Sequence, residues 1–420
     1  MGSQPILAGP GDRARIRLPR FSVSSVFFFF GLCLLAVSGW NPASAQPGSG
    51  TTEEAPLPHR FRSLEYFSNR KDFAATQVIA LESGKVLNQR NPTLLRAPAS
   101  LVKMMTILLA VEAVREGIVS FDDIVTIDPG APRIGGSGVG LRAGEEVTLL
   151  DLTKAMIIAS ANDAALAVAF HISGDVSTFV ERMNIRAAEL GMVHTWYLNP
   201  HGLDGWETTS VSTARDQAVL ARELLQDPKV LQWSSSRYTT IRGSQIIRTT
   251  NRLLGKFDGV DGLKTGYTGK AGYCLAATAE RDGFRVLSIL LGASSNERRF
   301  SETAGLLTAA FRDYQRIEVV QEGRDLNHRV DVLDGLPPEV RLVAGGSGHV
   351  VLRRDSNKRV TTELAAVTEA FAPVDEGRVL GTIEIRVADS LAATVPAVAV
   401  KASRKASFWE RLGQQLGLVR

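Results

Sequence analysis

The chain has few cysteines and little excess charge of either sign. Only two of its 420 residues are cysteines, and Cys33 lies in a long apolar run near the N-terminus. Cys274 is alone in the remainder, so an exported form would have no intramolecular disulfide. The formal net charge is +4, and four arginines less Asp12 within residues 1–20 supply +3 of it. Because phosphate binding needs a basic surface, the nearly neutral remainder argues against a nucleic-acid-binding protein.

The sequence also lacks the spacings that are typical of metal and phosphate sites. His201, in "NPHGLD", has no neighbour at a ligand spacing, so a loop-shaping or pocket-wall role is favoured over a ligand or base. The glycine-rich "GGSGVG" at 135–140 is not followed by Gly-Lys-Ser/Thr, and no helix is predicted there. A mobile loop over a site fits these residues better than a phosphate loop. We therefore expect no metal ion and no cofactor.

The N-terminal residues have the pattern of an export signal. A basic stretch ends at Arg20, an apolar core covers 26–37, and "ASA" at 43–45 predicts cleavage after Ala45. The alternative is an uncleaved anchor helix, although the apolar run from 21 to 37 is slightly short for a membrane span. Either interpretation places the folded part outside the cytoplasm. Residues 46–63 are predicted to be a flexible lead-in, because Pro, Gly, Thr and charged residues dominate it.

Residues 64–314 have the pattern of an α/β domain. Two short strands are predicted within 74–89, joined at "ESGK", and two more at 272–280 and 284–292. Helices are predicted between Pro98 and Gly117 and at 149–172, 176–190, 213–225 and 301–314. Strands at both ends with helices between them predict a sandwich whose sheet is built from distant parts of the chain.

The C-terminal hundred or so residues differ in texture. Short β-patterned runs with frequent Gly and Pro predict a separate small all-β domain over 315–400. Residues 401–420 have the pattern of an interfacial amphipathic helix that binds anionic lipid. Its apolar positions are Phe408, Trp409, Leu412, Leu416 and Val419, and its cations are Lys401, Arg404, Lys405, Arg411 and Arg420. The alternative is a helix docked on its own protein.

A lysine in an apolar helix is the first candidate catalytic residue. Lys103 stands three residues after Ser100 in "SLVK", and helical spacing puts the two side chains on one face. Burial disfavours the charged amine and lowers its pKa, which makes Lys103 a plausible base. Backbone N–H groups near the helix start could stabilise a developing negative charge. A surface lysine that reaches solvent is the alternative, and Ser68 to Lys71 repeats the spacing in polar surroundings.

Two further motifs follow in order. Ser160 and Asn162, in "SAND", lie within the predicted helix over 149–172, where polar residues need partners or a task. Lys264, Thr265 and Gly266 precede a predicted strand and could present a cation, a hydroxyl and open backbone to an extended peptide. Each alone is common, since "SSN" also fits Ser-x-Asn and Lys-Thr-Gly can be an ordinary turn. The ordered set of three is specific to serine acyl-transfer enzymes.

With "APASLVKMMT", "SANDAA", "NPHGLDG", "DGLKTGYTGKAGYCL" and "ERRFSETAGLL", the chain resembles the serine-type D-alanyl-D-alanine carboxypeptidases, the low-molecular-mass penicillin-binding proteins. The resemblance implies a β-lactamase/transpeptidase-like sandwich, in which an antiparallel sheet packs against a helical cluster. "APVDEGRVLGTIEIRV" at 372–387 extends it to the family's small β domain, and the basic tail matches the family's membrane helix. The implied location is the periplasmic face of the cytoplasmic membrane.

The resemblance also implies a role for each site residue. Ser100 would attack the penultimate D-Ala carbonyl of a peptidoglycan stem peptide, Lys103 would act as base, and Ser160 would relay a proton. Asn162 would hold the substrate amide, and β-lactam antibiotics would acylate the same serine. Positive charge would come from Lys264, the oxyanion would rest on the N–H groups of Ser100 and Tyr267, and Gly266 would leave the backbone open. Candidates for the terminal carboxylate are Thr265 and Arg299, with Arg298 as the alternative to Arg299.

The sequence departs from the family pattern at two places and leaves three rival functions open. Ser-Ala-Asn stands where Ser-Gly-Asn is frequent, and Tyr267 where a histidine often follows Lys-Thr-Gly, which bears on substrate preference. A β-lactamase would need a water-activating glutamate, and no Glu-x-x-Leu-Asn segment is present. A wall-binding scaffold would not need the full set of motifs. Endopeptidase action on cross-linked peptidoglycan would use the same chemistry.

Overall fold

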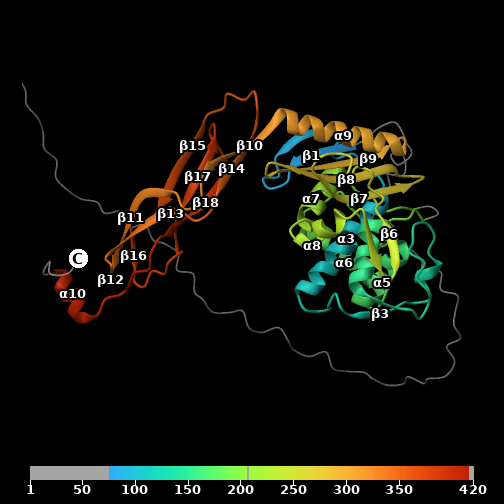
Figure 1. Cartoon of the computed structure of the whole chain (residues 1–420), viewed down its shortest axis with the longest axis horizontal. Helices are drawn as coiled ribbons and strands as arrows, with labels where there is room; N and C mark the ends of the chain where they lie inside the picture. The colour runs from blue at the N-terminus through green and yellow to red at the C-terminus, as the bar shows by residue number, and fades with distance from the viewer. Residues whose placement is uncertain (1–74, 206–207, 416–420) are drawn as a thin grey trace, which may run out of the picture. The chain divides into compact units, whose positions relative to one another are not determined.

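The computed structural model describes residues 75–205 and 208–415. The predicted export signal, the lead-in and the second Ser-x-x-Lys at Ser68 lie outside these residues. Within them, the chain forms the predicted α/β sandwich followed by an all-β domain and a short helix (Figure 1). The predicted fold class is therefore confirmed.

The sandwich is organised around one antiparallel sheet of five strands. These are β1 (Ala75–Ala80), β2 (Val86–Arg90), β7 (Val260–Thr268), β8 (Gly272–Arg281) and β9 (Phe284–Ala293), in the order β2-β1-β9-β8-β7. Residues 75–80 pair with 286–291, so the N-terminal hairpin completes the sheet begun by the last three strands. This is the predicted sheet built from distant parts of the chain, and β7 lies at its edge.

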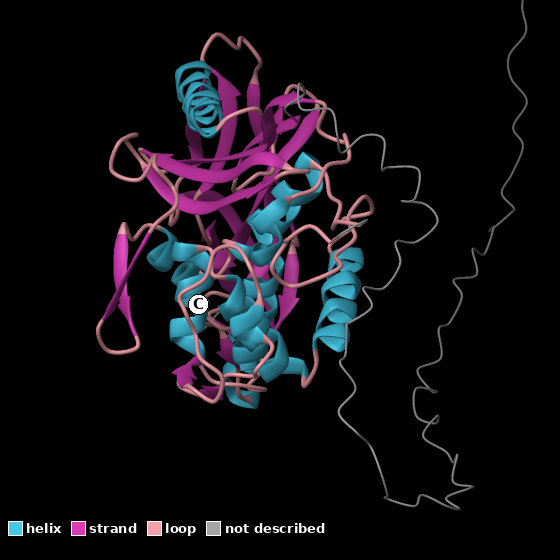
Figure 2. Cartoon of the chain, turned by 90° about the vertical axis from the view of Figure 1, so that its right-hand side faces the viewer, coloured by secondary structure: helices cyan, strands magenta, loops and turns pink. Residues whose placement is uncertain are grey.

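Helices cover both faces of the sheet, as Figures 1 and 2 show. Helix α9 (Asn296–Asp313) packs on one face. The other face is covered by α3 (Lys103–Arg115), α5 (Asn162–Ser173), α6 (Val176–Glu189), α7 (Ala214–Leu224) and α8 (Pro228–Ser234). Side chains of β8 alternate between the layers: Leu275 and Ala277 pack with α9, whereas Cys274 and Ala276 pack with the helical cluster. Both faces are buried, which explains the almost continuously apolar sequence of β8.

The structure corrects the predicted helix over 149–172. Helix α4 (Leu149–Lys154) begins with the predicted cap, since Asp151 N donates to Thr148 Oγ1. It continues as a π-turn (Ala155–Ala159) and stops at Ser160, whose left-handed φ of 63° breaks the helix before α5. Periodicity could not reveal this break, because the buried residues on both sides are equally apolar.

Other boundaries differ from the prediction for local reasons. Helix α9 begins at Asn296 rather than Ser301, because Ser295 accepts a capping hydrogen bond from Arg298 N. Lys-Thr-Gly lies within β7 instead of before a strand. The structure also contains 3₁₀ turns η1 (Ala99–Val102) and η2 (Ala131–Arg133), and two antiparallel strand pairs that were not predicted. Their strands are β3 (Ile124–Thr126) with β4 (Glu146–Thr148), and β5 (Tyr238–Ile241) with β6 (Gln245–Arg248).

The β domain has an apolar core of its own, formed by residues such as Val330, Leu342, Ile385 and Ala397. Its strands are β10 (Tyr314–Val320), β11 (Asp325–Leu333), β12 (Gly335–Leu336), β13 (Glu339–Ala344), β14 (Gly348–Arg353), β15 (Val360–Ala366), β16 (Glu369–Phe371), β17 (Val379–Val387), β18 (Ser390–Ala399) and β19 (Arg404–Lys405). Six of them form the sheet β15-β17-β18-β13-β11-β16. Helix α10 (Phe408–Gln415) follows, and residues 416–420 of the predicted amphipathic helix lie outside the described part. No helix in that part is long and apolar enough to cross a membrane.

Candidate active site

The serine and lysine of "SLVK" meet where η1 leads into α3. Lys103 Nζ lies 3.1 Å from Ser100 Oγ, and it donates to Asn162 Oδ1 and to the His201 carbonyl, each at 2.6 Å. Ala99, directly before the serine, has a left-handed φ of 51°. The 3₁₀ turn and this strained residue aim the hydroxyl at the amine, and they are the local reason why the two side chains meet.

The environment of Lys103 favours a neutral amine. Its side chain is fully buried, and this burial lowers the pKa of Lys103 well below its usual value. The charge of Lys264 lowers it further, whereas Asp163 raises it. A neutral Nζ at hydrogen-bond distance from Ser100 Oγ can accept the hydroxyl proton, so this pair has the geometry of a nucleophile and its base.

The helix break brings the second motif to the same place. The left-handed Ser160 turns its hydroxyl toward β7, where Lys264 Nζ donates to Ser160 Oγ at 2.7 Å and to Thr265 O at 2.8 Å. Asn162, at the start of α5, accepts from Lys103 through Oδ1 and donates through Nδ2 to Gly135 O at 2.7 Å. Ser160 therefore contacts one of the two lysines, and Asn162 contacts the other.

Edge strand β7 supplies the third motif. Lys264 is buried, and burial lowers its pKa to about 7, with a smaller contribution from Arg299. A side chain at Gly266 would place its Cβ 3.0 Å from Ser100 N, so glycine lets the strand approach the backbone of the serine. Tyr267 is exposed and stacks on Tyr273 with ring centroids 4.3 Å apart.

The structure distinguishes the two arginines that the sequence left open. Arg299 is buried, and its Nη1 donates to Gly266 O at 3.0 Å, so the guanidinium lies under the Lys-Thr-Gly strand. Burial lowers the pKa of Arg299 to about 10. Arg298 is exposed and contacts Ser294, just before the start of α9. Of the two, Arg299 reaches the site.

His201 shapes the loop that closes the site from another side. Its carbonyl accepts from Lys103, and its Nδ1 accepts from Leu203 N at 3.1 Å. Burial, followed by the charge of Lys103, lowers the pKa of His201 to about 3, so the ring is a neutral acceptor. Sequence reasoning anticipated a loop-shaping residue but missed the neighbouring Gly202, whose φ is +82°.

Other residues of the site were also missed. Thr250 Oγ1 lies 2.5 Å from Thr265 Oγ1, and the carboxylate of Asp163 accepts from Val139 N at 3.0 Å. The last residue of "SAND" could have been noticed, because a buried acid within an apolar stretch needs partners. Nothing in the sequence indicates Thr250, since it reaches Thr265 only through the fold. In the described ranges, no three His, Cys, Asp or Glu side chains are placed to hold a metal ion.

Comparisons with known proteins agree with this geometry. Residues 67–295 match the family model described as D-alanyl-D-alanine carboxypeptidase, and residues 314–405 match the C-terminal domain of penicillin-binding protein 5. D-alanyl-D-alanine carboxypeptidase DacF of Bacillus subtilis is 33% identical, with 81% of this chain and 88% of the relative covered. DacC of Escherichia coli is 33% identical, with 79% and 84% covered.

Solved structures of penicillin-binding proteins are also similar to this chain. Penicillin-binding protein 5 of Haemophilus influenzae is 29% identical and superposes with a TM-score of 0.64 over 79% of this chain and 97% of that one. Penicillin-binding protein D2 of Listeria monocytogenes, in its ampicillin-bound form, is 36% identical with a TM-score of 0.53 over 56% of this chain and 96% of that one. With a family model that covers more than half of its residues, this chain belongs to the D-alanyl-D-alanine carboxypeptidases and is a serine-type peptidase.

Proposed function

We propose that Ser100 of this carboxypeptidase attacks the penultimate D-Ala carbonyl of a peptidoglycan pentapeptide stem. The observation that carries the proposal is the 3.1 Å distance between Ser100 Oγ and the fully buried Lys103 Nζ. The serine proton passes to the neutral amine as the Oγ–C bond forms. The terminal D-Ala then leaves as an amine that receives a proton, and water later releases the shortened stem from the acyl-enzyme.

The remaining residues are assigned by their contacts. Ser160 relays the proton to the leaving amine, which its hydrogen bond to Lys264 supports. Asn162 fixes Lys103 and contacts the substrate amide with its second amide hydrogen, since the first is held by Gly135 O. The oxyanion is placed between the N–H groups of Ser100 and Tyr267, a position that the close packing of η1 against β7 supports.

The terminal carboxylate of the substrate is assigned to Thr265 and Arg299. Thr265 lies on the edge strand directly after Lys264, and Arg299 places a buried cation beneath the next residue. A planar guanidinium matches a carboxylate in charge and shape. A free carboxylate next to the scissile bond would thus be selected, as at the D-alanyl terminus of a pentapeptide stem.

The decisive experiment is digestion of a muropeptide mixture that contains monomeric pentapeptide and cross-linked dimer. The purified chain should convert pentapeptide to tetrapeptide and release D-Ala, and Ser100→Ala should release none. Ser301→Ala, at an exposed position on α9, is the matched serine control and should keep full activity. Conversion of dimer to monomer without D-Ala release would favour the endopeptidase.

β-Lactams are expected to acylate Ser100, because the Listeria relative is known in an ampicillin-bound form. Mass spectrometry after incubation with penicillin should show one adduct, located on the peptide that contains Ser100. Fast hydrolysis of penicillin without a lasting adduct would favour a β-lactamase. If penicillin forms no adduct and no D-Ala is released, the wall-binding scaffold is the interpretation that remains.

We also propose that helix α10 associates with the membrane surface. Phe408, Trp409 and Leu412 are exposed on one side of the helix, and residues 401–411 contain four cations against one acid. Phe408→Ser with Leu412→Ser should abolish co-sedimentation with anionic lipid vesicles. Tyr238→Ser, which removes an exposed aromatic side chain from the catalytic domain, should leave it unchanged.

The proposed location is the periplasmic face of the cytoplasmic membrane. It is supported by the export-signal pattern over residues 1–45 and by the basic apolar tail. Protease added to spheroplasts should digest the catalytic domain, because that face is accessible without lysis. Protection until the membrane is opened would contradict this location.

A further inference from the structure

A surface segment determines how the side chain of Asn162 is oriented. Residues 135–141 lie against the start of α5, where Asn162 N donates to Ser137 O and Asn162 Nδ2 donates to Gly135 O, both at 2.7 Å. Because the nitrogen end of the amide is held by Gly135, the oxygen end faces Lys103 at 2.6 Å. The position of the segment thus decides which end of Asn162 meets the catalytic lysine.

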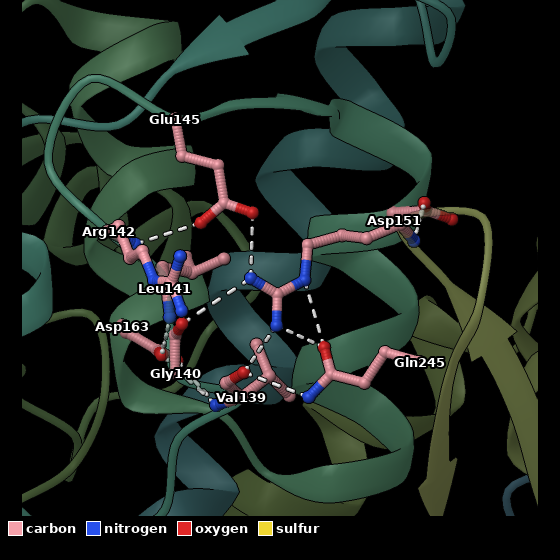
Figure 3. A network of polar contacts seen from close by, with 9 residues as sticks. Val139, Gly140, Leu141, Arg142, Glu145, Asp151, Asp163 and Gln245 are labelled. Carbon is pink, nitrogen blue, oxygen red and sulfur yellow. Dashed lines mark hydrogen bonds and ion pairs between the residues drawn. The ribbon is translucent and has the colours of Figure 1, made fainter.

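The segment itself is held from two sides at Val139 (Figure 3). On one side, the Asp163 carboxylate accepts from Val139 N at 3.0 Å and from Leu141 N at 3.2 Å. On the other side, Val139 O accepts from Arg242 Nη2 at 2.7 Å and from Gln245 Nε2 at 3.0 Å. Asp163 belongs to the "SAND" motif, whereas Arg242 and Gln245 come from the β5–β6 hairpin.

Arg242 is fixed in this position by several contacts of its own. Its backbone N donates to Asp151 Oδ2 at 2.7 Å, and Nη1 pairs with Glu145 Oε1 at 2.8 Å. It occupies the turn between β5 and β6 with a left-handed φ of 50°, a conformation that costs a non-glycine residue roughly 1–2 kcal/mol. Its side chain is only 20% exposed, so water screens the pair with Glu145 weakly. These contacts place the guanidinium accurately against Val139 and Gly140.

We infer that Arg242 is a positioning residue for acyl transfer: it holds residues 135–141 against Asn162 and so keeps Asn162 Oδ1 on Lys103. This inference rests on the proposed roles of Ser100 and Lys103. Arg242 touches no reacting atom in this scheme. Its effect reaches Asn162 through the segment. Loss of the guanidinium removes one of the two donors to Val139 O and the contact with Gly140 O, which loosens the segment and lets the amide turn.

The test is a double-mutant cycle on single-turnover acylation by a fluorescent penicillin, which keeps slow variants measurable. Arg242→Ala should lower the acylation rate about tenfold, the size of a coupling within one hydrogen-bond network. Arg242→Ala introduced into the Asn162→Ala variant should not lower the acylation rate further, because the amide through which Arg242 acts is gone. Arg248→Ala, an exposed arginine on the same hairpin, is the matched control and should leave the rate unchanged.

The pH profile is the second readout. Lys103 faces Ser100 and Asn162, the His201 carbonyl, and the charges of Lys264 and Asp163. Without the Asn162 acceptor the ammonium form of Lys103 is less stable, so the acid limb of acylation should move to lower pH in Arg242→Ala but not in Arg248→Ala.

If Arg242→Ala does not fold, Gln245→Leu takes its place with the same expected results, since it removes the second donor to Val139 O. An unchanged acylation rate, an equal loss in the Asn162→Ala background, or an unmoved acid limb would each overturn the inference. A wild-type protein that penicillin does not acylate would instead refute the proposed function.

Discussion

Replacing Gly202 with alanine should misplace the nucleophile without changing any group that takes part in the chemistry. Gly202 lies where the "NPHGLD" loop passes the residue before Ser100, and its φ is +82°. A Cβ there would lie 2.1 Å from Ala99 O and 3.1 Å from Ser100 N. Backbone atoms cannot rotate away, and ordinary contacts need about 3.5 Å, so the serine backbone or the loop must move by about 1 Å.

The expected magnitude follows from that displacement. A shift of about 1 Å at reacting groups can cost roughly 100-fold in rate, so acylation of Gly202→Ala by penicillin should be slowed to about that extent. The substitution should also lower the free energy of unfolding by about 1–2 kcal/mol, because alanine is unfavourable in the left-handed conformation.

Gly117→Ala separates these two effects. Gly117 also has a left-handed φ, +72°, but nothing lies within 4 Å of the Cβ that alanine would add. Urea unfolding should show a similar conformational cost in this control, whereas its single-turnover acylation should match wild type. If Gly202→Ala acylates as fast as Gly117→Ala, the close approach of the loop does not position Ser100 and the reasoning is refuted.

Three more changes test other parts of the fold. Burial lowers the pKa of Lys264 from 10.5 to about 7, so the unfolded chain binds more protons between these values and the unfolding free energy rises with pH. Lys264→Met should remove that part of the slope in urea unfolding at pH 7 and 9. Arg186→Ala removes the hydrogen-bonded partner of the buried Glu112 carboxylate and leaves it Arg115 at 3.8 Å, so it should lower the unfolding free energy by about 3 kcal/mol, with kcat unchanged. Thr250→Val removes the partner of Thr265 and should raise KM about fivefold at constant kcat, the worth of one hydrogen bond.

The sequence was informative wherever the signal was local. The hairpin over residues 75–90 and strands β8 and β9 are apolar runs that flank Gly-containing turns, and their prediction is confirmed. The same holds for the cap at Thr148, where the side chain and the amide that it binds are three residues apart. The identity of the Ser100–Lys103 pair was accessible because a single helical turn joins the two residues.

Features that depend on distant contacts could not be predicted. The break at Ser160 exists because α5 begins on a carbonyl of the 135–141 segment, through the bond from Asn162 N to Ser137 O. Arg242 lies in a hairpin that sequence patterns did not reveal, and its partner Val139 is a hundred residues away. Such pairs carry no local signature, since each partner alone is compatible with an ordinary surface turn.

The two buried lysines divide the acid and base work of the site between them. Each loses solvation, and the charge of Lys264 further lowers the pKa of Lys103, so a charged Lys264 favours a neutral Lys103. Lys264, with a pKa of about 7, carries the positive charge beside Ser160 below that pH and loses it above. The pH profile of acylation should therefore have an acid limb set by Lys103 and a basic limb near pH 7 set by Lys264. Lys264→Arg should move only the basic limb, to higher pH, because a guanidinium stays protonated; an unmoved basic limb would assign it to another group.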